Sequence, residues 1–164
     1  MLICKIVLIK EFAMSYWLMK SEPHVYNIDS LEKKRCEMWG KSVRNYQARN
    51  MMRDDMTIGD EIFFYQSNCQ NIGILGIAKV ASKPYPDPTQ FDIKSHYYDE
   101  KSSKENPRWV TIDVEFVRKF SRVITLSEIK AEKSLEGMIL TRKGNRLSIT
   151  PVKDTHWQKI LSLE

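Results

Sequence analysis

The stretch EIFFYQSNCQNIGILGIAKVA, residues 61–81, decides the fold, because it holds two apolar runs that each have the length of a buried strand. Residues 61–67 form the first run, which is rich in aromatic side chains, and residues 72–81 form the second. Gly73 and Gly76 lie inside the second run, which indicates a bulge or the close approach of another backbone or a ligand. The sequence therefore predicts two mostly buried strands here.

Further strands are predicted on both sides of this pair. From Val110 to Phe116, apolar and polar residues alternate, which is typical of a strand with one exposed face, and we place this strand at 110–118. Short apolar runs predict strands at 16–20 and 147–149, and prolines end both, at Pro23 and Pro151.

Short helices are predicted between the strands. Capping boxes, Asp29 with Glu32 and Thr125 with Glu128, open helices at about 29–36 and at 126–131, and a last helix begins near Asp154. Residues 45–53 contain no glycine or proline and fit a helix or helical turns, whereas 83–107 read as a long loop. No strand is followed by a glycine-rich turn and a long helix, so these elements predict a mixed α+β domain with a small, largely antiparallel barrel.

The length of 164 residues fits one domain, and 26 basic against 21 acidic side chains give a net charge of +5. This charge permits an anionic partner without requiring one. The three cysteines form no C-x-x-C pair and the three histidines are scattered, so we expect a reducing compartment and no metal site.

The N-terminal residues are unusual. Residues 2–9 are apolar but too short to span a bilayer, which needs roughly 20 residues. We assign residues 1–13 to an N-terminal extension, either an upstream start or a small added strand, and residues 14–164 to one domain. We expect a soluble protein in the cytoplasm, or in the nucleus if the source is eukaryotic.

The most informative functional stretch is WGKSVRNYQARNMMR, residues 39–53, which contains four basic residues and no acid. Arginine forks suit phosphates and base edges, aromatic rings stack on bases, and amides both donate and accept hydrogen bonds. A basic surface helix with Trp39 in the core explains the same residues without a ligand. Arg44, Arg49 and Arg53, together with Arg142 and Arg146 of a second acid-free stretch, are predicted to lie on one face and contact phosphates, and Lys41 joins them.

Two catalytic interpretations find little support. The Gly40-Lys41-Ser42 segment lacks the upstream glycine and strand of a P-loop. Ser21, Ser67 and Cys69 are not in a recognisable nucleophile motif. In contrast, polar residues such as Ser67 and Asn68 near aromatic residues suit a flat, partly polar ligand such as a base.

Several separate motifs, in one order, resemble an EVE domain of the PUA-like superfamily. They are YWLMKSEP (16–23), VRNYQARN (43–50), GDEIFFYQSN (59–68), GI..AKV (76–80), YPDPTQFD (85–92), YYD (97–99), NPRW (106–109), R.GNRLS (142–148) and PV…W..IL (151–161). The resemblance covers nearly the whole chain from Met14. It departs from the family at Lys41-Ser42, where an acid and a glycine are expected, and residues 1–13 have no counterpart.

The resemblance implies a fold and a function. The fold is α+β, a PUA-like small β-barrel with short flanking helices. The function is that of a nucleic-acid-binding module, not an enzyme, which recognises a modified base, a modified cytosine in DNA, in an aromatic-lined pocket. By motif match the pocket residues are Lys20, Ser21, Trp39, Val43, Arg44, Asn45, Tyr65, Ser67 and Asn68.

Partners and alternatives follow from the same residues. The expected partner is DNA or RNA with a modified base, with no cofactor and no membrane. Two alternatives stay open: an enzyme acting on a nucleotide or nucleic acid through the same pocket, and a binding module for another small ligand. A binding module is favoured over an enzyme because aromatic, amide and arginine side chains are present without an evident nucleophile–base pair.

Overall fold

The computed structural model describes residues 14–40 and 42–164; the predicted N-terminal extension and Lys41 lie outside the described residues. The elements in chain order are β1 (Tyr16–Ser21), α1 (Ile28–Lys34), β2 (Cys36–Met38), α2 (Tyr46–Asn50), the π-helical turn η1 (Met51–Asp55), β3 (Glu61–Gln66), β4 (Gly73–Val80), β5 (Tyr85–Pro86), the 3-10 turn η2 (Pro88–Phe91), β6 (Val110–Thr111), β7 (Asp113–Thr125), α3 (Leu126–Ala131), the 3-10 turns η3 (Lys133–Leu135) and η4 (Ile139–Thr141), β8 (Ile149–Val152) and α4 (Asp154–Leu161).

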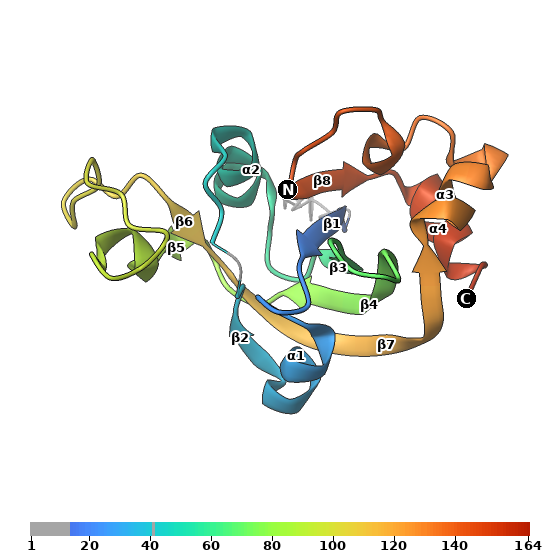
Figure 1. Cartoon of the computed structure of the whole chain (residues 1–164), viewed down its shortest axis with the longest axis horizontal. Coiled ribbons are helices and arrows are strands. Elements are labelled where there is room, and N and C mark those ends of the chain that lie inside the picture. The colour runs from blue at the N-terminus through green and yellow to red at the C-terminus, as the bar shows by residue number, and fades with distance from the viewer. Residues whose placement is uncertain (1–13, 41) are drawn as a thin grey trace, which may run out of the picture.

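Six strands form one curved sheet in the order β2-β7-β4-β3-β1-β8 (Figure 1). The central pair β1–β3 is parallel, and the other neighbours in the sheet are antiparallel. The mixed, largely antiparallel α+β class is therefore confirmed, but the expected closed barrel is corrected to an open sheet. Among the described residues, the edge strands β2 and β8 are not paired with each other. The three-residue β2 pairs only with β7, and β8 pairs only with β1.

Both faces of the sheet are buried. The side chains of Trp17 and Met19 in β1 enter one hydrophobic cluster, together with Phe64 of β3, whereas Leu18 and Phe63 enter a second cluster on the other face. Helices α1 and α2 with η1 cover the first cluster, and α3 and α4 with the 3-10 turns between them cover the second. The double burial explains why these strands are almost continuously apolar.

The two glycines of β4 let the neighbouring strand β7 pass close by. A Cβ added to Gly73 would lie 2.2 Å from the Ile124 carbonyl oxygen, and one added to Gly76 would lie 2.4 Å from that of Arg118. The β4–β7 register also shifts between Ile74 and Gly76. The predicted bulge with close approach of another backbone is confirmed, and the thirteen-residue β7 curves across the sheet there (Figure 1).

The predicted strand at 147–149 is shifted to β8, Ile149–Val152, which contains Pro151. Pro151 is opposite Trp17 in an edge strand, where one side of the backbone has no partner strand and a missing amide hydrogen is tolerated. The first predicted helix ends at Lys34, because Arg35 has a φ of 68° and its amide caps the Leu31 carbonyl. The short strands β2 and β5 were not predicted from the sequence.

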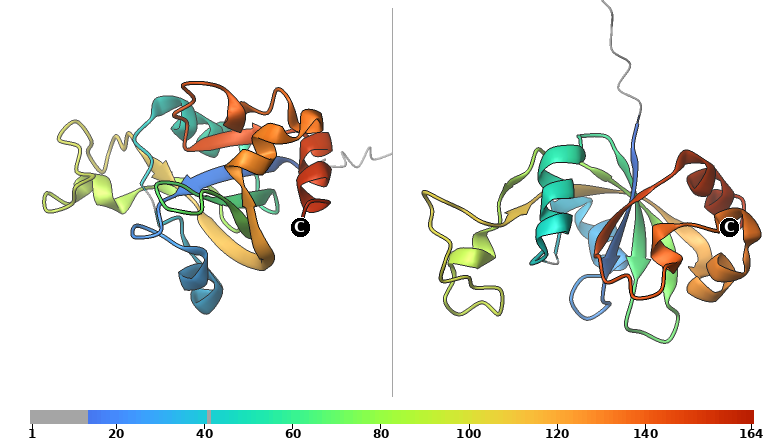
Figure 2. Two further views of the ribbon diagram at one scale, coloured as in Figure 1. Left: turned by 45° about the vertical axis from the view of Figure 1, so that its right-hand side comes forward. Right: turned by 90° about the horizontal axis from the view of Figure 1, so that it is seen from above.

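The predicted loop at 83–107 is folded. It carries β5 and η2 and, together with β6, projects from the sheet as an arm (Figures 1 and 2). We call residues 83–109 the arm. The side chain of Gln90, which is fully buried, donates to the carbonyl oxygens of Asp87 and Trp109 at 2.8 Å, and its Oε1 accepts from the amides of Arg108 and Trp109. One amide side chain thus joins the two halves of the arm.

The capping box at α3 gives the first testable prediction. Hydrogen bonds from the hydroxyl and amide of Thr125, followed by those from Arg122, lower the pKa of Glu128 to about 2. A carboxylate with a depressed pKa stabilises the fold above its ordinary pKa near 4.5, and this stabilisation is lost as the pH falls toward 2. We expect Glu128→Gln to lower the free energy of unfolding at pH 7 and to have much less effect at pH 2.5.

Urea denaturation at the two pH values measures this difference. Glu136→Gln, at an exposed glutamate just beyond η3, is the matched control. An equal loss of stability for Glu128→Gln at both pH values would show that the charge of Glu128 does not stabilise the fold.

Candidate nucleic-acid interface

Five of the predicted pocket residues meet where the parallel strands β1 and β3 end. Lys20 is opposite Tyr65 in the register, and its Nζ lies 6.0 Å from the centre of the Tyr65 ring. The amide and the hydroxyl of Ser67 donate to the Ser21 carbonyl oxygen at 2.8 and 3.2 Å. Asn68 follows in the left-handed region with a φ of 53°, where asparagine is tolerated, and is exposed. These residues form one continuous polar edge.

Tyr65 and Ser21 are tied into the body of the protein at this edge. Burial, and then the nearby Cys69, raise the pKa of Tyr65 to about 12, so its phenol is neutral at pH 7. The Ser21 hydroxyl is fully buried and donates to the Tyr26 carbonyl oxygen at 2.8 Å. The solvent-facing groups of the edge are therefore those of Lys20, Ser67 and Asn68, which are partly or fully exposed.

Trp39 lies on the other face of the sheet. Its ring is 2% exposed and packs edge-on against Tyr26 and Phe64, with centroids 5.2 and 5.5 Å apart. Trp39 and Val43 belong to the first cluster, whereas Tyr65 belongs to the second. Successive residues of a strand face opposite sides, so Trp39 and Tyr65 pack on different faces of the sheet, and their joint role in one pocket stays a prediction. In this conformation the expected stacking face of Trp39 is covered by the core.

Gly40 follows Trp39 and lies against Tyr26. A Cβ at this position would lie 2.4 Å from Cδ2 of the Tyr26 ring, so any larger residue would force the ring or the backbone to move. The backbone at Gly40 is exposed. Tyr26, whose carbonyl oxygen accepts from the Ser21 hydroxyl and whose ring contacts Trp39, therefore links the polar edge to the core.

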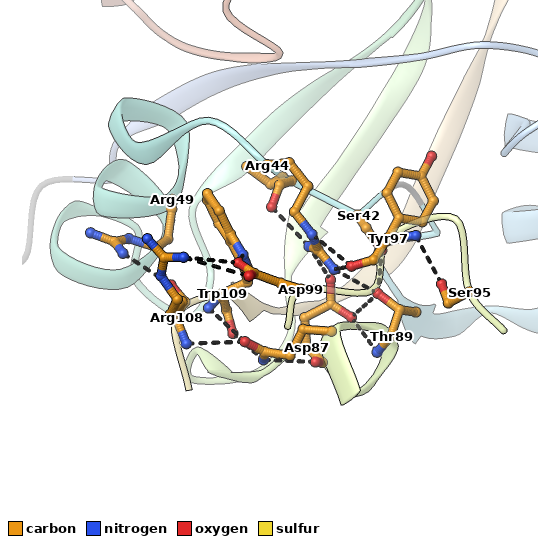
Figure 3. A network of polar contacts seen from close by, with 12 residues as sticks. Ser42, Arg44, Arg49, Asp87, Thr89, Ser95, Tyr97, Asp99, Arg108 and Trp109 are labelled. Atoms are coloured by element: carbon orange, nitrogen blue, oxygen red, sulfur yellow. Dashed lines mark hydrogen bonds and ion pairs between the residues drawn. The ribbon is translucent and has the colours of Figure 1, made fainter. Parts of the chain in front are cut away.

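Arg44 is bound to the arm (Figure 3). Its guanidinium donates to Asp87 Oδ2 at 2.8 Å, to Thr89 Oγ1 at 2.9 Å and to the Tyr97 carbonyl oxygen at 2.6 and 3.1 Å. The planar fork of arginine is suited to several acceptors at once. We predicted Arg44 to contact a base or phosphate, but the structure uses its donors to hold the arm against the segment that follows Trp39.

Asp87 is the charged partner of Arg44, and it is 1% exposed. Burial raises the pKa of this carboxyl, but hydrogen bonds from Thr89 and Arg44 outweigh burial and leave the pKa below its ordinary value. Asp87 also accepts from the Thr89 amide at 2.8 Å and so caps η2. The carboxylate is therefore ionised at neutral pH, and it has a structural role.

A second cationic group surrounds Tyr46, which is 47% exposed. Its ring stacks on Trp109 with centroids 4.9 Å apart, and the Arg49 guanidinium lies 4.6 Å from its centre. The Tyr46 hydroxyl accepts from Arg108, and Arg49 donates to the Arg108 carbonyl oxygen at 3.0 Å. The sequence did not single out Arg108; the NPRW motif was the available signal, since it places an arginine beside Trp109.

The remaining predicted contact residues differ in their availability. Asn45 caps α2, because its side-chain oxygen accepts from the Ala48 amide at 3.0 Å. Arg53 is paired with its neighbour Asp54 through two hydrogen bonds of 2.7 Å. Arg142 and Arg146 are exposed and form no ion pair with any part of the chain that the structure describes. Whether the predicted arginines form one contact face stays a prediction.

Neither a metal cluster nor a membrane helix is found in residues 14–40 and 42–164. No group of three or more His, Cys, Asp or Glu side chains in these ranges could hold a metal ion. None of the helices in these ranges is long and apolar enough to cross a membrane.

The EVE domain family matches residues 15–163, and the chain belongs to this family. Thymocyte nuclear protein 1 is a relative: the chicken protein is 44% identical over 91% of this chain and 68% of its own length, and the human protein is 41% identical over 92% and 74%. The resemblance seen in the sequence is thereby confirmed.

Solved structures agree with this assignment. A crystal structure of a Pseudomonas syringae protein is 46% identical, with a TM-score of 0.86, over 90% of this chain and 98% of that one. The human THYN1 protein in complex with DNA containing 5-methylcytosine is 41% identical, with a TM-score of 0.84, over 91% and 96% of the two chains. The fold and 41% of the aligned residues are therefore shared with a protein crystallised in complex with DNA containing 5-methylcytosine.

The Arg44–Asp87 pair gives the second prediction. Removing one partner of a buried ion pair typically costs roughly 3–5 kcal/mol, and we expect the lower end because the Arg44 side chain is 21% exposed. Arg44→Ala and Asp87→Ala combined in a double-mutant cycle should show a coupling free energy of about 0.5–3 kcal/mol in urea denaturation.

The exposed pair Arg53–Asp54 is the matched control, for which much weaker coupling is expected because solvent screens exposed ion pairs. Amide exchange at Asp99, whose amide donates to the Gln90 carbonyl oxygen inside the arm, should accelerate only in the Arg44 and Asp87 variants. Additive effects of the two substitutions would contradict a direct role of this pair.

Proposed function

We propose that this protein binds nucleic acid and recognises a modified base, a modified cytosine in DNA, at the edge formed by Lys20, Ser21, Tyr65, Ser67 and Asn68. The observation that carries the proposal is the 41% identity, over 91% of the chain, to the human protein crystallised with 5-methylcytosine DNA. The protein acts as a reader and not as an enzyme. RNA binding and catalysis on a nucleotide are the alternatives that the experiments below distinguish.

The chemistry of the edge supports this role. Asn68 offers both a donor and an acceptor, the Ser67 hydroxyl, whose proton is donated to Ser21, offers a further acceptor, and Lys20 brings a cation beside them. A base must leave its stack to reach such an edge, and this costs a few kcal/mol, least for unpaired or mismatched bases. Lys20, Ser67 and Asn68, the solvent-facing groups of the edge, are the side chains that we assign to contact with the extruded base.

The other predicted pocket residues receive supporting roles. Trp39 and Val43 pack in the core cluster that contains Tyr26, and Arg44 and Asn45 hold the arm and α2 in place. Arg142 and Arg146, which are exposed, contact backbone phosphates. Arg49 and Arg53 contribute less, because Asn50 and Asp54 each accept two hydrogen bonds from them.

Asn68 is the most informative position at which to test base recognition. Glycine adopts a φ of 53° at least as readily as asparagine does, so Asn68→Gly removes the side-chain amide without straining the turn. We expect this variant to lose about 1–3 kcal/mol of affinity for a methylcytosine duplex and to lose most of the preference over the unmodified duplex. Trp39→Ala is less informative, because emptying a core site costs roughly 3–5 kcal/mol of stability.

Fluorescence anisotropy with paired oligonucleotides, identical except for the 5-methyl group, measures this preference. Asn106→Gly, on the exposed part of the arm, is the matched control. An unchanged ratio of modified to unmodified affinity in Asn68→Gly would refute the proposed pocket. Tighter binding of the same sequence as RNA would favour the RNA alternative, and conversion of the base during incubation would reveal an enzyme.

Arg146 tests the backbone contacts separately. A phosphate contact carries no sequence information, so Arg146→Ala should weaken binding to modified and unmodified duplexes equally. The slope of log affinity against log salt should become shallower by about 0.9. A variant that changes the modified-to-unmodified ratio would place Arg146 at the base and not at the backbone.

A further inference from the structure

A small hollow lies between the turn at η4 and the beginning of α4. Its volume is about 190 Å³, several times the roughly 30 Å³ that a water molecule occupies in the liquid. Backbone and apolar groups of Gly137, Met138, Ile139, Pro151 and Val152 form part of its lining. The charged or titratable side chains in the lining are Arg142, Lys153 and His156, and the lining contains no acid.

The hollow is at a helix N-terminus whose amides are free. Lys153 precedes α4 as its N-cap, and no side chain caps the helix. The first backbone bond of α4 runs from the Trp157 amide to the Lys153 carbonyl oxygen at 2.9 Å. The amides of Asp154, Thr155 and His156 have no acceptor among the described residues. Free amides and the helix dipole both favour an anion at this end of a helix.

His156 supplies independent support for a ligand here. Its side chain is 6% exposed, yet neither ring nitrogen is hydrogen-bonded to any residue that the structure describes. Burial, and then the charge of Lys153, lower the pKa of His156. The ring nitrogens of His156 are not among the fully buried polar atoms without a partner in the described residues, and His156 lines the hollow, so an anion in the hollow can reach them. An anion in the hollow would give this ring an acceptor and would oppose the repulsion between His156 and Lys153.

We propose that this hollow binds a phosphate group of the nucleic-acid backbone, held by the α4 amides, Arg142, Lys153 and His156. The assignment of the phosphate to nucleic acid rests on the proposed function. The donors present, which are amides at a helix end with an arginine and a lysine, are those that bind phosphate in general. A free phosphate ion has the same chemistry, and the experiments separate the two sources.

The position of the hollow suits a flanking phosphate. The Lys20 amide donates to the Ser148 carbonyl oxygen at 2.8 Å, so the basic turn at 142–148 leads from the base edge toward the hollow. At the hollow, Val152 is opposite Tyr16, four residues before Lys20 in β1. At about 3.3 Å per residue the two sites are roughly 13 Å apart along the strand, or about four base-pair steps of 3.4 Å.

The first experiment titrates the whole protein with inorganic phosphate at constant ionic strength and pH, with backbone amide NMR shifts as the readout. We expect saturable shifts at the amides of residues 154–156 and at the His156 ring. Arg142→Ala and Lys153→Ala should each weaken phosphate binding about threefold to tenfold. Lys133→Ala, an exposed lysine of η3 outside the lining, should leave it unchanged.

Shifts that chloride reproduces, or that Lys133→Ala weakens as much as Arg142→Ala, would overturn the site. A sulfate titration adds a check that does not depend on the ionisation of phosphate. Since an anion favours the imidazolium, sulfate should raise the pKa of His156, followed through its ring signals. Lys153, which lines the hollow with His156, opposes that charge when the hollow is empty.

The second experiment identifies the source of the phosphate with an unmodified duplex. If the backbone fills the hollow, Lys153→Ala should weaken duplex binding and reduce the salt slope by about 0.9, and Lys133→Ala should not. Normal duplex binding by a variant that has lost free phosphate would overturn the assignment to nucleic acid. If the wild-type protein binds no oligonucleotide, both the proposed function and that assignment fail, while the phosphate titration still decides whether the hollow is an anion site.

Discussion

The parallel pairing of β1 with β3 is the constraint on which the rest of the molecule depends. Both strands are buried on both faces, and polar contacts fix both ends of the pair. At the start, the buried carboxylate of Asp60 accepts from the Trp17 indole at 2.9 Å and from the Ser15 and Thr57 amides. At the end, Ser67 donates to Ser21. This register determines which polar groups emerge together at the edge that we assign to the base.

The arm is held to the rest of the protein by hydrogen bonds from Arg44. Residues 39–53, with four cations and no acids, predicted a surface that binds an anionic ligand. In the folded chain, however, Asp87 is the anion that pairs with Arg44 of this stretch. Asp87 comes from a distant segment, and its hydrogen bonds with Thr89 and Arg44 keep it ionised although it is buried. The segment after Trp39 therefore mainly joins the arm to the core through Arg44. The exposed arginines without an ion pair among the described residues include Arg142 and Arg146.

The edge that we assign to the base and the basic turn at 142–148 are built in different ways. The edge that we assign to the base consists of serines bonded to the backbone and an asparagine in a left-handed turn, and its geometry follows from the strand register. The exposed basic turn beside β8 contacts it through Lys20 and Ser148 but is not part of the core. Base discrimination and electrostatic attraction can therefore change independently, as the separate expectations for Asn68→Gly and Arg146→Ala require.

The sequence by itself determined the α+β class, the strands around residues 61–81, the capping box at Thr125 and the family, because these features are set by neighbours in the chain. Local patterns do not report which face of a sheet a residue occupies relative to a distant one. The placement of Trp39 and Tyr65 in different core clusters was therefore decided only by the tertiary structure. The pairing of Arg44 with Asp87 was decided in the same way. The same holds for the open sheet, since closure depends on whether the edge strands β2 and β8 meet, and for the hollow at α4, where Arg142 and His156 come together only after folding.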